Sequence, residues 1–260
     1  MKWEILFKIF RNFCLLTLFT AIIKTSVFAQ VNTEAMRKSE LKEGFTSTNS
    51  FNIQLTKGNS DYVIYKGQVR LDFIKGRYHS FIISNLKHGE QKNKKFINKG
   101  FIHLRGVQSF NKMISAEIFG QIEYDDFIKL KRRKLGGAGL RLLRLKKPGL
   151  LTVHIGIGAM KETEIYTIST EGEKDLLRST NYLTTNFSLN KIVNLYVTGY
   201  YQVDVQSFSD YRILFDGGLS IKLFKNLIFT TNVAYRFDNE PLPGIKTYDV
   251  NLLNGISLRF

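Results

Sequence analysis

The chain has 260 residues, 43% of them hydrophobic, and a formal net charge of +16. Its mean hydropathy of −0.13 resembles that of a water-soluble protein, and no stretch beyond the N-terminal region reaches the roughly 18 consecutive apolar residues that a transmembrane helix needs. The one cysteine, Cys14, lies within the first 29 residues. A mature chain that begins at residue 30 would therefore have no disulfide, thiolate metal site or thiol nucleophile.

Residues 1–29 have the pattern of a cleavable secretory signal peptide. Lys2, Lys8 and Arg11 precede or flank a short apolar run over residues 13–23, and Val27-Phe-Ala29 offers small residues for cleavage. Removing the four cations and one anion of this region lowers the charge by three, from +16 to +13. A net positive charge of this size could indicate a nucleic-acid partner, but export from the cytoplasm argues against such a partner. We expect an anionic glycolipid as the acidic partner instead.

Residues 30–44 are polar and do not alternate, which predicts a periplasmic lead-in. From residue 45 onward, apolar and polar residues alternate with a period of two, the pattern of strands with one apolar face. The alternation predicts about twelve strands, at Phe45–Thr56, Tyr62–Ile74, Tyr78–Lys87, Phe96–Gln108, Met113–Tyr124, Leu135–Leu145, Leu150–Met160, Leu177–Leu189, Ile192–Gln206, Tyr211–Phe224, Leu227–Phe237 and Thr247–Phe260. An even number of strands near 9–11 residues long predicts an all-β fold, an antiparallel transmembrane β-barrel over residues 45–260.

The connections between these strands alternate in length. Those after even-numbered strands are tight, whereas those after odd-numbered strands are mostly longer, with residues 57–61 and 207–210 as short exceptions. Short periplasmic turns and longer outer loops are typical of outer-membrane barrels, and this parity would place both termini in the periplasm. A soluble β-sandwich is the alternative fold, but it would not require such parity.

The last predicted strand carries apolar residues at alternate positions and ends on Phe260. This pattern is typical of the C-terminal strand of a bacterial outer-membrane barrel. It predicts the outer membrane as the location and the barrel-assembly machinery as a partner that contacts this strand.

Several short stretches resemble one family. They are Gln54-Leu-Thr-Lys-Gly-Asn-Ser-Asp61, Phe119-Gly-Gln-Ile-Glu-Tyr-Asp-Asp-Phe127 with Arg133 and Leu135-Gly-Gly-Ala-Gly-Leu140, and Leu151-Thr-Val-His-Ile-Gly-Ile-Gly158. With these stretches the chain resembles the salt-induced outer-membrane protein family, an uncharacterised domain of unknown function. The resemblance implies an outer-membrane barrel over about residues 45–260 and transfers no catalytic residue.

If the more apolar series of each strand faces lipid, the other series lines the interior. The charged residues of that series that we single out as candidates are Lys66, Arg70, Arg105, Glu117, Glu123, Arg141, Asp216 and Arg236, and it also holds Asp72, Lys99, Asp204, Arg212, Lys222, Asp238, Asp249 and Arg259. Such residues could form the charged wall of a narrow solute channel. They could equally fill the interior as mutually paired side chains, among them Arg141 with Glu117.

Two histidines, His103 and His154, fall on the interior series near Glu117 and Glu123. A histidine beside a carboxylate can act as a general base or a metal ligand, so an outer-membrane lipid hydrolase is an alternative function. No nucleophile pattern accompanies them. We therefore expect a non-enzymatic protein without metal or cofactor, either a narrow channel or envelope-stress protein or a structural or interaction barrel.

The densest basic run lies at residues 125–134, which we interpret as an outer loop. Its cations are Lys129, Lys131, Arg132, Arg133 and Lys134. Forked guanidinium groups suit phosphate oxygens, so the run predicts contact with outer-membrane lipids and lipopolysaccharide, although a solvated loop explains it as well.

Overall fold

A computed structural model describes residues 32–34, 36–37, 42–92, 94–168, 172–190, 192–224 and 226–258. The all-β prediction is confirmed, because one sheet contains twelve antiparallel strands in sequence order. The strands are β1 (Gly44–Thr56), β2 (Tyr62–Lys75), β3 (Tyr78–Gln91), β4 (Lys94–Ser109), β5 (Ile114–Asp125), β6 (Leu130–Lys147), β7 (Leu151–Tyr166), β8 (Glu173–Leu189), β9 (Val193–Asp204), β10 (Tyr211–Lys222), β11 (Leu227–Asp238) and β12 (Tyr248–Leu258), with one short 3₁₀ helix, η1 (Asp126–Ile128).

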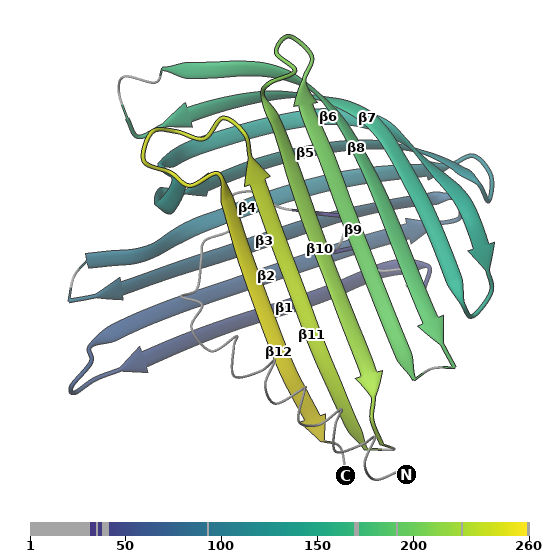
Figure 1. Ribbon diagram of the computed structural model, residues 1–260, viewed down its shortest axis with the longest axis horizontal. Helices are drawn as coiled ribbons and strands as arrows, with labels where there is room; N and C mark the ends of the chain where they lie inside the picture. Colours follow the sequence, from purple (N-terminus) through teal and green to yellow (C-terminus); the bar gives the residue numbers. More distant parts are fainter. Residues whose placement is uncertain are drawn as a thin grey trace, which may run out of the picture.

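Each strand pairs with the next along the chain, so the topology is an up-and-down meander. The register is regular over most of the sheet, with shifts near Gly89, Glu123, Leu130 and Leu143. The right-handed twist of strands makes such a long meander curl, and Figure 1 shows that the sheet wraps around an interior. The sheet therefore has an inner and an outer face. Within the described residues, no helix is long and apolar enough to cross a membrane.

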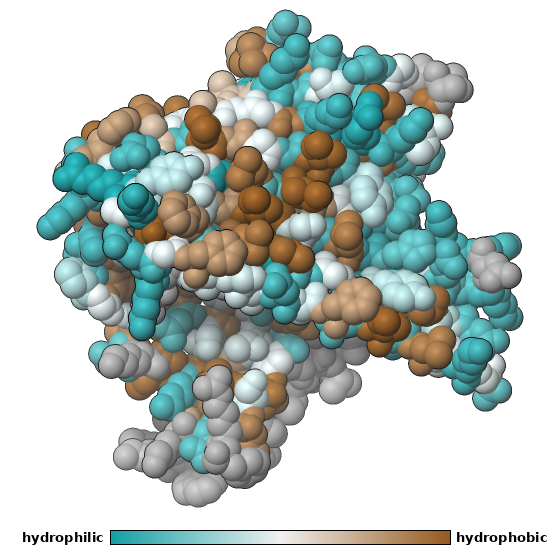
Figure 2. Space-filling view, turned by 180° about the vertical axis from the view of Figure 1, so that it is seen from behind, coloured by the Kyte–Doolittle hydropathy of each residue, from teal (hydrophilic) through white to brown (hydrophobic). Residues whose placement is uncertain are grey.

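Burial is inverted relative to a water-soluble protein. The inner face carries most of the buried residues, and charged and polar side chains outnumber hydrophobic ones among them. The outer face carries large hydrophobic side chains that are exposed, for example Ile102, Leu104, Ile118, Ile122, Leu140, Ile157 and Leu183. Figure 2 shows hydrophobic side chains gathered over the middle of one face and hydrophilic ones towards its ends. A charged interior inside an apolar exterior is the arrangement that a lipid surround favours.

Several strands extend further than the sequence alone predicts, whereas β9 and β10 end before the predicted Gln206 and Phe224. Among the strands that extend further, β6, β7 and β8 have 18, 16 and 17 residues. They take up much of the connections predicted at residues 125–134 and 161–176, and the interpretation of residues 125–134 as a loop is wrong from Leu130 onward. Residues 1–29, Arg259 and Phe260 lie outside the described residues, so the signal peptide and the terminal aromatic stay predictions.

Candidate functional site

The N-terminal residues 32–34 and 36–37, here called the inner segment, lie inside the curled sheet. The Asn32 side-chain amide donates a hydrogen bond to the Thr198 carbonyl of β9, and Arg70 of β2 donates one to the Met36 carbonyl. Asn32, Thr33 and Glu34 are buried. One segment that contacts strands this far apart in a meander must occupy the middle of the interior. These five residues of the predicted lead-in over residues 30–44 therefore contact the inner face of the sheet, and the periplasmic location of the lead-in stays a prediction.

Glu34 is the centre of an ionic cluster, the Glu34 cluster, in which Glu34, Arg105 and Glu117 are buried and Arg37 and Arg141 are partly buried. The Glu34 carboxylate accepts Arg141 Nη2 at 2.7 Å, Arg37 Nε at 2.8 Å and Arg105 Nη1 at 3.4 Å. Arg37 and Arg105 also reach Glu117, at 2.5 and 3.1 Å. The predicted ion pair of Arg141 with Glu117 is not found. Arg141 pairs with Glu34 instead, and Arg105 contacts both Glu34 and Glu117.

Because Glu34 is ionised, the contribution of this cluster to the stability of the fold depends on pH. Burial opposes the charged form, but Arg37, Arg141 and Arg105 outweigh it and lower the pKa of Glu34 from 4.5 to about 2. The carboxylate therefore stabilises the fold fully above about pH 4.5, and the contribution is lost as the pH falls towards 2. We expect the difference in unfolding free energy between wild type and Glu34→Gln to be constant at neutral pH and to shrink below pH 4.5. Urea titrations across that range measure it, and a difference independent of pH would contradict the assignment.

A chain of hydrogen bonds runs from this cluster along the inner face. Arg105 Nε donates to His103 Nε2 at 3.4 Å, which leaves the proton of a neutral His103 on Nδ1. That Nδ1 lies 3.0 Å from Gln121 Oε1, and Gln121 Nε2 donates to Glu123 at 2.6 Å. Both ring nitrogens of His103 are thereby engaged.

The chain ends at a second buried cluster, the Arg133 cluster, which consists of Glu123, Arg133, Glu162, Glu164, Arg178 and Arg212. Arg133 of β6 pairs with Glu123 of β5 and with Glu164 of β7, the latter at 2.5 Å. Glu162 accepts Arg212 Nη1 at 2.8 Å and Arg178 Nε at 3.0 Å. Arg212 belongs to β10, three strands away from β7, so this pair bridges the interior. Arg178 and Glu162 are both 0% exposed.

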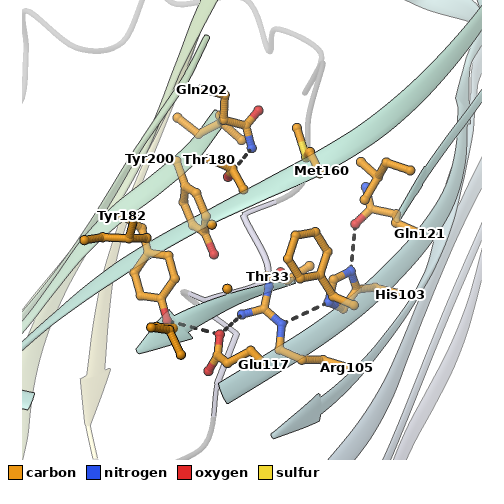
Figure 3. A pocket seen from close by; sticks show the side chains of 17 residues that line it. Thr33, His103, Arg105, Glu117, Gln121, Met160, Thr180, Tyr182, Tyr200 and Gln202 are labelled. Atoms are coloured by element: carbon orange, nitrogen blue, oxygen red, sulfur yellow. Dashed lines mark hydrogen bonds and ion pairs between the residues drawn. The ribbon is translucent and has the colours of Figure 1, made fainter. Parts of the chain in front are cut away.

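A small cavity lies beside the Glu34 cluster (Figure 3). Its volume is about 40 Å³, room for about three water molecules. The side chains that Figure 3 labels around it are Thr33, His103, Arg105, Glu117, Gln121, Met160, Thr180, Tyr182, Tyr200 and Gln202. Most of these carry hydrogen-bonding groups, but the space holds no solute larger than a few atoms.

The ring of Tyr182 packs on Gly156 of the neighbouring strand, and its hydroxyl donates to Glu117 at 3.2 Å. A Cβ at Gly156 would overlap that ring. We expect Gly156→Ala to lower the unfolding free energy by about 1–3 kcal/mol through overpacking. Gly199 of β9 is the matched control, because a Cβ there meets nothing within 4 Å, and Gly199→Ala should stay within about 0.5 kcal/mol. Equal losses in the two variants, measured by urea unfolding, would contradict the packing argument.

The other charged residues predicted for the interior divide into two groups. Arg70 and Asp72 pair at 2.6 Å, and Arg236 and Asp216 at 2.8 Å, on the inner face. Lys66, by contrast, is an exposed residue of β2. The residues that the sequence reasoning missed are Glu34, Arg37, Glu162, Glu164 and Arg178. The alternation of Glu162 and Glu164 with Lys161 and Thr163 is a signal that could have extended the strand.

The basic run does not form one surface. Arg133 is buried in the Arg133 cluster, so the prediction that it contacts lipopolysaccharide is wrong. Strand alternation turns Arg133 inward and its immediate neighbours Arg132 and Lys134 outward, and the register shift between Leu130 and Arg132 leaves Lys131 exposed as well. Lys129, in the left-handed conformation that ends η1, donates to the Pro243 carbonyl at 3.4 Å.

The groups considered for catalysis do not assemble around a nucleophile. Ser115 contacts Ser109, with 3.0 Å between the hydroxyl oxygens. His154 Nδ1 is buried and has no hydrogen-bond partner within the described residues. In that same part of the chain, no three histidine or carboxylate residues gather closely enough to hold a metal ion.

One protein family matches most of the chain. The family described as "Protein of unknown function, DUF481" matches residues 50–260. No curated protein matches the chain. The matched residues cover nearly all of the sheet, from within β1 to the end of β12. The chain therefore belongs to the DUF481 family.

Proposed function

We propose that the protein is an integral outer-membrane β-barrel whose interior is closed in this conformation, and that it serves a structural or interaction role rather than a catalytic one. The observation that carries the proposal is the inversion of burial. Charged groups that are costly to bury alone are paired inside the curled sheet, while large aliphatic side chains face outward.

Three further observations support the location. Residues 1–29 have the pattern of a secretory signal peptide, the last strand alternates towards Phe260, and the chain resembles the salt-induced outer-membrane protein family. Exported barrels meet anionic glycolipid in the outer leaflet. We assign that contact to the exposed cations Lys131, Arg132 and Lys134, and the C-terminal strand to the barrel-assembly machinery.

The closed interior is supported by its contents. The Glu34 cluster and the Arg133 cluster each join side chains from several strands, and a cavity of about 40 Å³ lies beside the first. A hydrolytic role lacks support, because both nitrogens of His103 serve the hydrogen-bond chain between the clusters.

Planar bilayers test this proposal. The refolded protein, inserted at neutral pH, should conduct no ions above the leak of the bare membrane. Insertion is checked separately by protease protection in vesicles of the same lipid. A steady unitary conductance of the wild-type protein would overturn the closed interior.

A narrow channel is the second candidate, favoured by one observation. The inner segment is bound to the sheet by hydrogen bonds and ion pairs of side chains and by hydrogen bonds to individual backbone carbonyls, and its described residues contribute no strand to the sheet. A chain that begins at residue 42 should keep the twelve strands yet conduct ions if the segment blocks a pathway. Absence of conductance in this shortened chain, with insertion intact, would exclude the channel.

A further inference from the structure

We infer that Arg105 and Arg141 form a binding site for small carboxylates in the interior, and that Glu34 of the inner segment occupies this site as an intramolecular ligand. The inference rests on the closed interior proposed above and goes beyond it by naming the class of ligand. Arg141 directs Nε and Nη2 at one oxygen of the Glu34 carboxylate, at 3.1 and 2.7 Å. Arg105 approaches the other oxygen at 3.4 Å.

The two cations of the site come from the sheet, whereas the anion does not. Arg105 belongs to β4 and Arg141 to β6, and the strand between them, β5, supplies Glu117. Glu117 also neutralises Arg105, but the ion-pair partner of Arg141 is Glu34. Departure of Glu34 would leave the partly buried Arg141 guanidinium without the counter-ion that it has within the described residues. An uncompensated charge of this kind favours a new anion of the same shape.

The anion can leave without disturbing the sheet. Among the described residues of the inner segment the backbone-to-backbone hydrogen bonds are local, from Met36 N to the Thr33 carbonyl and from Arg37 N to the Glu34 carbonyl, and the bonds to the sheet run through side chains, such as that from Arg70 to the Met36 carbonyl. Departure would also remove Arg37, which comes from the same segment. The remaining fork of Arg141 and Arg105 would then face a solute alone.

The surroundings of the site suit a carboxylate with a short body. The cavity next to Arg105 is lined by His103, Gln121, Tyr200 and Gln202 together with the apolar Met160 and Leu214. His154, whose buried Nδ1 has no hydrogen-bond partner in the described part of the chain, lies on the inner face of β7 two residues from Gly156, the register partner of Arg141. It offers a further donor to an incoming oxygen.

Chemical rescue tests the site. Glu34→Ala removes a CH₂–COO⁻ unit, which acetate replaces almost atom for atom. In detergent, acetate should raise the melting temperature of Glu34→Ala by about 2–4 °C at a concentration roughly five times its dissociation constant. Chloride at the same ionic strength should not. Wild type, whose site is filled, and the double variant Glu34→Ala with Arg141→Ala, whose site lacks the fork, should show no such rise.

Each outcome decides the matter. No rise in Glu34→Ala, or an equal rise in wild type or in the double variant, overturns the site. If Glu34→Ala does not fold in chloride, recovery of the folded species in acetate supports the site, and failure to recover overturns it. Rescue by phosphate without rescue by acetate would refute the carboxylate class. Because these measurements need neither a bilayer nor conductance, they fail independently of the proposed function.

Discussion

Arg133→Ala should destabilise the protein by about 3–5 kcal/mol, the cost of leaving buried carboxylates without their counter-ion. Arg133 is 3% exposed and pairs with Glu123 and Glu164, and its Nε also lies 3.6 Å from Glu162. Its removal leaves three buried acidic side chains with less compensation. The effect is measured by urea unfolding of the refolded protein in lipid vesicles. The folded fraction is read from unheated samples in gel electrophoresis, in which folded and unfolded protein migrate differently.

The adjacent Arg132 is a matched control, because it belongs to the same basic run and the same strand but is exposed. Arg132→Ala should change the unfolding free energy by no more than about 0.5 kcal/mol. If Arg132 and Arg133 lie in one solvated loop, both variants should be nearly neutral. Equal effects of the two substitutions would therefore refute the alternation of β6 at this point.

The strands were predictable because their signal is local. A period of two in hydrophobicity records one apolar and one polar face, and it holds wherever the outer face is aliphatic. It disappears where a strand continues beyond that apolar band. In β7, Glu162 and Glu164 alternate with Lys161 and Thr163, so both faces are polar although the pairing with β6 and β8 continues. The predicted strand accordingly ends at Met160, before these residues.

The site was predictable only in part. Facing residues such as Arg105 and Glu117 follow from alternation on neighbouring strands, but which cation meets which anion depends on where the inner segment lies. That segment has no periodic pattern, and Glu34 is 107 residues from Arg141 along the chain. Its position is set by charge pairing across the interior, a contact that no local sequence signal records.

Ile118→Arg should destabilise the protein in lipid vesicles by about 2–4 kcal/mol, the depth-dependent cost of a charge that faces the hydrocarbon core of a bilayer. Ile118 lies in the middle section of β5, is 66% exposed, and pairs across the strands with Gly106 and Ala138. The same substitution on a protein surrounded by water would be close to neutral, because an exposed side chain gains hydration when it becomes charged. The urea-unfolding free energy of this variant in vesicles therefore reports the surroundings of the outer face.

Phe127→Arg is the control that separates the effect of depth in the bilayer from the effect of introducing an arginine. Phe127 is 51% exposed, comparable with Ile118, but it lies in η1, beyond the end of β5. Near a membrane interface the cost of an arginine falls to about 0–1 kcal/mol, so the two variants should differ by roughly 2 kcal/mol in vesicles. If both are nearly neutral, the apolar outer face is not in contact with hydrocarbon, and the inverted burial needs another partner to cover it. If both are equally costly, the apolar band extends past the strand ends, and the outward cations Lys131 and Lys134 would then lie at the wrong depth to contact glycolipid phosphates.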